Sequence, residues 1–428
     1  MIQQTVLPCK TIRTEKLLTP RGGLLPYAEL IKALSVDDLV DTLLPKTKSS
    51  HGFKASQYVT PLMLTLYAGG SAIADMRIIA LDGAGQEALG LEKVPGESAT
   101  GDWLVRTAER GGVSAILTIN DHVVKKALQV DPKKGIILVS DPSIIKTYKR
   151  EAMMTYLGHK GYRPMMAFDL RTSAVINHEF RNGNDNARRK EFIAASYEKV
   201  ENFGSYVSLF LGDSEFYQAD VIEYIDGKGS RYIIAVDKDS AVMKVIDAVP
   251  DKNWQPLRTE DDLPTGREIS ESVHIMNGMK KAFRIVIQRW PDPTNPEQYC
   301  YHVLATNDLK LSMQEIVWAY GDRATQENSI KEVKSCFGMH KLPSNDFGAN
   351  ALFFGIGILS YNLFIAQKEL TFPPEMRKVK INTVRWSLIN IAGQLVLAGK
   401  SLLLKLAISI ETIDLINYMR RRTYALSN

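Results

Sequence analysis

The sequence predicts an α/β protein: a helical amino-terminal part, then a core of buried strands and helices that is interrupted by a mainly-β segment. Three observations support this fold class. Helical apolar patterns dominate residues 1–130, strand-length apolar runs alternate with helical patterns in 131–236, and alternating segments joined by a Pro-rich turn fill 237–308. With 428 residues, 45% of them hydrophobic, the chain can form two or three domains with sizeable cores.

Two of the apolar strand patterns end in an aspartate. Residues 135–140 (GIILVS) lead to Asp141, and residues 206–212 (YVSLFLG) lead to Asp213. Neighbouring strands of one sheet can bring such distant carboxylates together, so both are candidates for a shared site. Each has a structural alternative, because Asp141 precedes Pro142 as turn aspartates do, and Asp213 could cap the helix that follows.

Residues 320–334 (YGDRATQENSIKEVK) carry long polar side chains at intervals of three, four and seven residues. On a helix, four of these side chains share one face, and Lys331 lies just beyond its edge. This face holds a single acid among groups that can bind phosphate. The alternative is an ordinary solvated face, although such a face more often places Glu four residues before Lys. At about 100° per residue, four of these residues share a helical arc of about 60°: Tyr320, Arg323, Glu327 and Lys334.

The spacing Tyr-x2-Arg-x3-Glu-x6-Lys resembles the YREK signature of bacterial insertion-sequence transposases with a DDE catalytic triad. Other phrases resemble the branch of that family known as DDE group 1, and they occur in the family's order. The resemblance is good from about residue 141 to 366, weaker near 18–24 and weak over the last sixty or so residues. The matching phrases are 160–164 (KGYRP), 167–172 (AFDLRT), 180–184 (FRNGN) and 212–216 (GDSEF).

This resemblance implies an RNase H-like catalytic core. Asp141, Asp213 and Glu327 would be the catalytic acids and the metal ligands, holding two Mg²⁺ ions for which Mn²⁺ can substitute. Carboxylates without clustered His or Cys suit a hard cation such as Mg²⁺. The implied reaction cuts transposon ends, through a hairpin in YREK members, and joins them to target DNA.

The remaining residues of the polar face are predicted to bind DNA. Arg323 and Lys334 would hold phosphates near the scissile bond, and Tyr320 would offer a hydroxyl or a stacking surface. Lys331 joins this set from its position on the helix. The implied partners are DNA, as terminal inverted repeats and as target, and a second copy of the chain in a homodimer.

Two departures from the family pattern affect the predicted metal site. Relatives often carry Asp-x-Asp at the first metal position, whereas this chain has Val139-Ser140-Asp141 and so a single carboxylate there. Glu215 stands where Gly is common, and it could bind metal or face solvent. Two other functions remain open: a domesticated DNA-binding protein without mobility, and an RNase H-like nuclease.

With this resemblance, the chain divides into five predicted segments. A pair of the amino-terminal helices could form a helix-turn-helix, and the alternative is a packing or dimer-forming bundle. The segments are 1–130, helical, for DNA binding or dimer contacts; 131–236, first part of the RNase H-like core; 237–308, a β-rich insertion; 309–370, the catalytic helix and core completion; and 371–428, a basic carboxy-terminal region.

Global composition agrees with this prediction. A net charge of +5 is modest for a DNA-binding protein, so basic residues should be grouped. The apolar stretch 349–367 contains Asn350, Ser360 and Asn362, so we expect a buried core helix and no membrane partner. Three cysteines without metal or disulfide spacing, and an amino terminus unlike a signal peptide, predict a cytoplasmic protein, bacterial and nucleoid-associated when bound to DNA.

Overall fold

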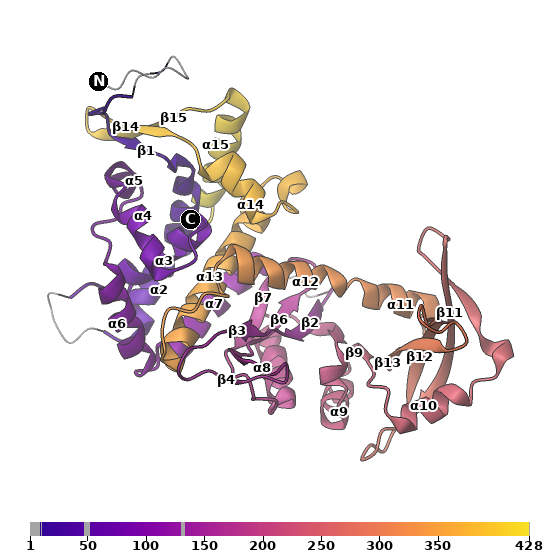
Figure 1. Cartoon of the computed structure of the whole chain (residues 1–428). Coiled ribbons are helices and arrows are strands. Elements are labelled where there is room, and N and C mark those ends of the chain that lie inside the picture. The colour runs from indigo at the N-terminus through magenta and orange to yellow at the C-terminus, as the bar shows by residue number, and fades with distance from the viewer. Residues whose placement is uncertain (1–8, 10, 47–51, 130–132, 428) are drawn as a thin grey trace.

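The computed structural model describes residues 9, 11–46, 52–129 and 133–427 (Figure 1). Helices fill the amino-terminal part, where Pro26 near the start of the first helix fits the rule that proline suits the first helical turn. The helices of this part are α1 (Leu25–Ala33), α2 (Val36–Leu43), α3 (Ser56–Tyr67), α4 (Arg77–Ala80), α5 (Gly83–Ala88), α6 (Glu97–Ala108) and α7 (Gly112–Leu128).

A nine-stranded mixed sheet forms the centre of the protein, with the strand order β10-β11-β12-β13-β9-β8-β2-β6-β7. The neighbours β2, β8 and β9 are parallel, and every other pairing in the sheet is antiparallel. Helices α8 (Arg189–Asn202) and α9 (Ala219–Gly227) connect the parallel strands. The strands near the start of this region are β2 (Ile136–Pro142), β6 (Met165–Asp169), β7 (Val175–Glu179), β8 (Val207–Gly212) and β9 (Arg231–Ala235).

The mainly-β segment after β9 extends this same sheet. Its last strand pairs antiparallel with β9, with Leu304 opposite Ala235, so the sheet continues outward without a break. Figure 1 shows this arm at the right, where α10 (Ser240–Asp247) lies beside the strands. The strands of the arm are β10 (Gln255–Arg258), β11 (Pro264–His274), β12 (Phe283–Pro291) and β13 (Tyr299–Thr306).

The chain crosses back from this arm through an interrupted helix. The first piece, α11 (Met313–Gly321), begins with a capping box in which Ser312 and Glu315 bond each other's backbone N–H groups. After a turn come α12 (Ala324–Lys331) and a five-residue π-helix, Glu332–Cys336. The expectation of one continuous α-helix over 320–334 was wrong, because the polar residues lie on three pieces with different helical geometry.

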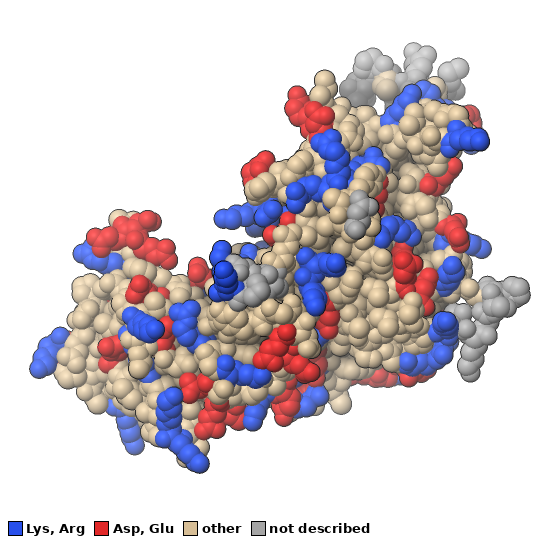
Figure 2. Space-filling model, turned by 180° about the vertical axis from the view of Figure 1, so that it is seen from behind, with Lys and Arg blue, Asp and Glu red and all other residues tan. Residues whose placement is uncertain are grey.

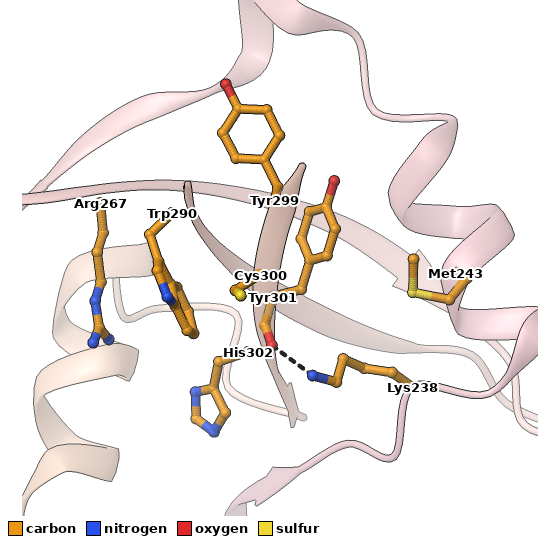
Figure 3. A pocket seen from close by; sticks show the side chains of 8 residues that line it. All are labelled: Lys238, Met243, Arg267, Trp290, Tyr299, Cys300, Tyr301 and His302. Atoms are coloured by element: carbon orange, nitrogen blue, oxygen red, sulfur yellow. Dashed lines mark hydrogen bonds between the residues drawn. The ribbon is translucent and has the colours of Figure 1, made fainter. Parts of the chain in front are cut away.

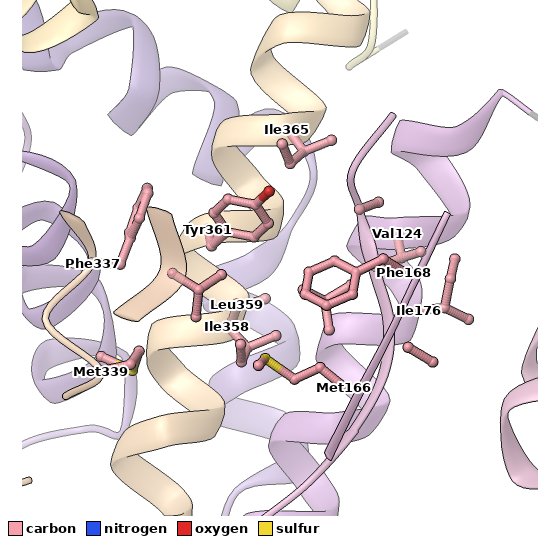
Figure 4. Close-up of a cluster of buried hydrophobic side chains, with 14 of the residues drawn as sticks. Val124, Met166, Phe168, Ile176, Phe337, Met339, Ile358, Leu359, Tyr361 and Ile365 are labelled. Atoms are coloured by element: carbon pink, nitrogen blue, oxygen red, sulfur yellow. The ribbon is translucent and has the colours of Figure 1, made fainter. Parts of the chain in front are cut away.

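A 24-residue helix, α13 (Phe347–Leu370), is the centre of the hydrophobic core. It packs against α7, α6 and α3 and against the sheet, and Figure 4 shows its side chains between Met166 and Phe168 of β6 and the segment that follows the π-helix. Gly357 permits close contact there, because a Cβ atom would lie 1.9 Å from the sulfur of Met339. Phe337 meets Tyr361 edge-on, at 5.5 Å between ring centroids.

Among the described residues, α13 is the one helix long and apolar enough to cross a membrane, and its most apolar window is wholly buried inside the protein. The prediction of a buried core helix over 349–367 is confirmed by this burial. Two of its polar residues bond inside the core: Asn362 donates to the carbonyl of Val175 at 2.9 Å, and the Ser360 hydroxyl pairs with Tyr27. These bonds satisfy groups that would be costly to bury alone.

The carboxy-terminal region returns to the amino-terminal helices, as Figure 1 shows. Strand β1 (Leu18–Thr19) pairs with β14 (Gly393–Ala398), which pairs with β15 (Ser401–Leu406). The last helix, α15 (Ile410–Tyr424), packs on α1, and Arg420 forms a 2.7 Å ion pair with Glu29. Residues before β14 form α14 (Ile381–Val384) and a π-helix (Arg385–Ile389).

Basic and acidic side chains mix over the face opposite to that of Figure 1. Figure 2 shows blue and red atoms interspersed there. This mixing agrees with the small net charge of +5. Grouping of basic residues therefore has to be sought at particular elements rather than over a whole face.

Candidate active site

The two strand-end aspartates lie next to each other at one edge of the sheet. Asp141 is near the end of β2, and Asp213 directly follows β8, the parallel neighbour of β2. The register pairs Ser140 with Gly212, which places the following residues side by side. Because side chains alternate along a strand, both carboxylates project on the face where Val139 and Leu211 pack in a small apolar cluster with residues of α11.

One guanidinium group lies between these two carboxylates. The Nη2 atom of Arg323 is 2.7 Å from Oδ1 of Asp141 and 3.8 Å from Oδ2 of Asp213. All three side chains are half-buried, at 16%, 19% and 30% exposed respectively. A cation therefore already occupies the place toward which both acids point.

Burial shifts both carboxylates toward the neutral form. The pKa of Asp141 is raised to about 7, mainly by burial and further by the charges of Asp213 and Glu327, against the lowering effect of Arg323. The pKa of Asp213 is also raised, by burial first and then by Glu215, and Arg323 again opposes the rise. A single guanidinium therefore does not fully compensate two buried acids, and additional positive charge would favour their ionised forms.

The third predicted acid is near this pair but does not touch it. Glu327 is exposed on α12, and its charge contributes to the raised pKa of Asp141. Within the described ranges, no three His, Cys, Asp or Glu side chains come close enough to hold one ion. The structure thus brings Asp141 and Asp213 together, and Glu327 would have to move inward to complete a three-carboxylate site.

The other predicted residues of the interrupted helix have different surroundings. Tyr320 is half-buried, and the centre of its ring is 5.5 Å from that of His302 and 5.9 Å from the guanidinium carbon of Arg323. Lys334 is in the π-helix, where its Nζ atom donates to the carbonyl of Ile144 at 2.7 Å. Lys331 is exposed on α12. Lys334 therefore holds the chain beyond Asp141, a contact that the helical spacing did not predict.

Glu215 does not face solvent, so that expectation was wrong, and the alternative that it binds metal stays a prediction. Its carboxylate bonds Arg163 and, at 3.1 Å, Arg189, and its side chain is only 10% exposed. This buried ion pair fixes the loop that carries Asp213. The phrase KGYRP, which contains Arg163, was a signal in the sequence, but nothing in it indicated that this arginine would meet Glu215.

A cavity of about 700 Å³ lies on the arm beside the site (Figure 3). Its lining combines flat rings with cations: the guanidinium of Arg267 lies 4.4 Å from the ring of Trp290, and Lys238 donates to the carbonyl of Tyr301. His302 belongs to both this cavity and the site, because its ring contacts Tyr320. Rings beside cations form surfaces on which nucleic acid bases stack.

The donor set of the site fits a hard divalent cation. Carboxylate oxygens are the ligands that Mg²⁺ and Mn²⁺ accept. Burial raises the pKa of Asp141, and a cation bound beside it would favour its ionised form. Two carboxylates at the ends of adjacent strands are a donor set that metal-dependent phosphoryl-transfer enzymes can use.

Comparison with known families makes the assignment specific. Residues 14–427 match the family described as transposase DDE domain group 1, and the chain belongs to this family. It is therefore a DNA transposase, and enzymes of this kind use divalent metal ions.

Among solved structures, the cryo-EM structure of the piggyBac transposase synaptic complex with hairpin DNA is similar, with 13% sequence identity and a TM-score of 0.48. The match covers 88% of this chain and 83% of that one. The search of curated proteins found no match.

Proposed function

We propose that this transposase cuts transposon ends and joins them to target DNA, with Asp141, Asp213 and Glu327 as its catalytic acids. One observation carries the proposal: Asp141 and Asp213 leave adjacent parallel strands and share the guanidinium of Arg323. Separate turn or capping roles would not require both carboxylates to face one cation. Asp213 does cap the turn after it, by accepting from the N–H of Glu215, and this bond leaves its other oxygen toward Arg323.

The fold within the large sheet is proposed to be RNase H-like. The five strands β7-β6-β2-β8-β9 support this, because three of them are parallel and the first hairpin partner, β6, is antiparallel. The spacing of Tyr320, Arg323, Glu327 and Lys334 supports a YREK-type enzyme of a bacterial insertion sequence. A cytoplasmic location, with association with the nucleoid through DNA, belongs to the same proposal.

We propose two Mg²⁺ ions as the metal, with Mn²⁺ as a substitute. When bound, such a pair supplies Lewis-acid stabilisation of the attacking and leaving oxygens of the phosphodiester. The three acids would hold it, with Asp141 and Asp213 fixed by the sheet and Glu327 brought in by α12. His and Cys take no part.

Arg323 is proposed to change partners when the site is loaded. Its guanidinium now compensates part of the charge of Asp141 and Asp213, and it would be repelled by divalent cations at the same carboxylates. A guanidinium binds phosphate in a bidentate manner, so DNA offers it a new partner close by. Arg323 would then orient the scissile phosphate, while Tyr320 supports it from the side and Lys331 binds backbone phosphate further along α12.

The ring-lined cavity of Figure 3 is proposed to receive unpaired bases of the cut end. Formation of a hairpin on the transposon end needs a sharply bent strand, and bases freed by the bend need a stacking surface. Trp290 and Arg267 provide such a surface, and His302 connects it to Tyr320. We further propose a homodimer that joins two transposon ends, because transposition acts on both.

A cleavage assay tests the proposal. The substrate is a labelled duplex that carries the terminal inverted repeat found beside the coding region, incubated with Mg²⁺. The wild-type chain should cut at the repeat boundary, whereas Glu327→Gln should bind this duplex but not cut it. If the wild-type chain does not cut at the repeat but cuts branched DNA of any sequence, an RNase H-like nuclease is favoured. If the wild-type chain binds the repeat and cuts neither substrate, a domesticated protein is favoured.

A further inference from the structure

The segment that follows Asp141 folds into a small sheet of its own. Its strands are β3 (Ile145–Lys146), β4 (Met153–Met154) and β5 (Lys160–Tyr162), in the order β3-β5-β4. We call residues 144–160 the basic platform. It lies between the end of β2 and the start of β6, so the chain on either side of it leads into the central sheet.

The platform carries an excess of positive charge with little internal compensation. It holds four Lys or Arg residues and a single acid, Glu151. That acid is already engaged, because it accepts from the N–H of Phe347 at 2.7 Å and pairs with Arg150 at 3.1 Å. Across the described part of the chain, the other three cations have no acidic partner within 4.0 Å: Lys146, Lys149 and Lys160.

Large aromatic side chains are exposed among these cations. Tyr148 is 77% exposed and Tyr156 is 70% exposed, although burial would normally cover rings of this size. Each ring has a cation over it, the Nζ atom of Lys146 at 5.9 Å from Tyr148 and the guanidinium of Arg163 at 5.3 Å from Tyr156. Cations interleaved with exposed rings are typical of nucleic acid surfaces, whereas protein interfaces are depleted of Lys.

Direct contacts fix the platform to the active site. Lys334 bonds the carbonyl of Ile144, and Arg163 joins the Tyr156 ring to Glu215, two residues after Asp213. Ile144 is three residues beyond Asp141, about 10 Å of extended chain at roughly 3.3 Å per residue. A duplex turn is about 34 Å long, so the start of the platform lies within one turn of DNA held at the acids.

We infer that the basic platform binds the phosphate backbone of the transposon-end duplex within one helical turn of the scissile phosphate. Lys146, Lys149 and Lys160 supply the charge, and Tyr148 and Tyr156 pack against sugar and base edges. The inference rests on the proposed site of cleavage at Asp141 and Asp213. It adds a DNA-binding element outside the interrupted helix that carries Glu327.

Equilibrium binding at several salt concentrations tests this surface. The probe is a fluorescein-labelled duplex that contains the terminal inverted repeat and flanking base pairs, in EDTA so that no cleavage occurs. Each lost phosphate contact should reduce the steepness of log K against log salt by about 0.9. The triple variant K146Q/K149Q/K160Q should therefore have a slope about 2 to 3 smaller than wild type. The matched control changes three exposed lysines elsewhere: K252Q/K310Q/K400Q.

Phosphate position is tested by neutral methylphosphonates placed singly along the same duplex. Within one turn of the scissile phosphate, a methylphosphonate should weaken binding by wild type but not by the platform triple variant. Equal salt slopes for the platform and control variants would overturn the inference. It would also be overturned if the platform variant removed the methylphosphonate effect only on a target duplex and not on the transposon end. A change in oligomeric state with unchanged DNA binding would show a protein interface instead.

The proposed catalytic function is tested separately from the DNA contact of the platform. Wild-type cleavage in Mg²⁺ is measured on the same duplex, and its absence would contradict the assigned acids without affecting the salt slopes measured in EDTA. Normal cleavage by wild type, together with a platform variant whose salt slope equals that of wild type, would contradict only the role inferred for the platform.

Discussion

The strand ends that carry Asp141 and Asp213 and the helical segment that carries Glu327 are held in different ways. The strand ends are fixed by the register between β2 and β8 and by the buried cluster under α11. The helical segment is interrupted twice between α11 and the π-helix, and Glu327 is exposed on it. The site thus has a half held by the sheet, which we call the rigid half, and a half whose exposed acid would have to move inward to join it, which we call the adjustable half.

This difference suggests a division of roles. A preformed pair of acids can capture a first metal ion, while an acid on an adjustable helix can complete the site when DNA draws Arg323 away. Short π-helical turns are common at functional sites, and here such a turn places Lys334 against the chain beyond Asp141. The following predictions test the division, from the largest expected effect to the smallest.

Removal of one acid from the rigid half should abolish cleavage. Asp141→Asn or Asp213→Asn should slow cutting in Mg²⁺ by at least about 1,000-fold, because several kcal/mol of transition-state stabilisation are lost with the metal. Single-turnover cleavage of the labelled end measures the effect. Asp220→Asn, the same change at an exposed acid of α9, should leave the rate unchanged. Cutting by the Asp141 or Asp213 variant within tenfold of wild type would contradict the role of these acids.

Stability should depend on the core and not on the adjustable half. Leu359→Ala removes a fully buried side chain of α13 and should reduce the free energy of unfolding by about 2–5 kcal/mol. Glu327→Gln changes an exposed residue and should alter it by no more than about 0.5 kcal/mol. Urea denaturation followed by circular dichroism compares them. A large loss of stability in the Glu327 variant would mean that α12 is part of the rigid half.

Arg323 should oppose metal binding and support DNA binding. Without its positive charge 2.7 Å from Asp141, Arg323→Gln should bind Mn²⁺ about tenfold more tightly, a change of about 1.4 kcal/mol. The same variant should bind end DNA about tenfold more weakly. Calorimetric Mn²⁺ titration and fluorescence anisotropy measure the two affinities, and Arg323→Lys is the control that retains charge. Unchanged Mn²⁺ affinity in the Gln variant would disprove the competition.

The rigid half should also show a pH dependence through His178 on β7. Burial lowers the pKa of His178 to about 3 from its ordinary 6.5. Between these values His178 binds a proton in the unfolded chain but not in the folded chain, so its contribution to stability should fall as pH decreases from about 6.5 toward 3. The slope is at most about 1.4 kcal/mol per pH unit.

His178→Gln should reduce this slope by removing the titrating group. Urea denaturation at pH 5 and pH 7 measures it in both proteins. Equal slopes in the two would mean that His178 does not remain neutral in the folded core.

Sequence patterns predicted the rigid half well. The strand pattern at 135–140 corresponds to β2 (Ile136–Pro142), and that at 206–212 corresponds to β8 (Val207–Gly212). Buried parallel strands have a strong local signature, because both of their faces are apolar. Their adjacency could then be anticipated from the order of elements, whereas the register that aligns Asp141 with Asp213 is seen only in the structure.

The adjustable half could not be predicted in the same way. The polar spacing from Tyr320 to Lys334 implied a single helix, but Val333 and Phe337 are buried in the core, and this packing accompanies the π-helical turn. Such a turn arises from tertiary contact rather than from local propensity. The partners of Glu215 were missed for a similar reason, since Arg163 and Arg189 come from separate elements far from it in sequence. The catalytic roles themselves remain predictions.

Crystals of the protein with transposon-end DNA and Mn²⁺ would test the central claim most directly. Anomalous scattering locates Mn²⁺ without reference to the protein. We expect Mn²⁺ peaks bound by carboxylate oxygens of Asp141, Asp213 and Glu327, with Arg323 on a phosphate. Mn²⁺ held elsewhere, or a loaded site in which Glu327 still faces solvent, would contradict the account.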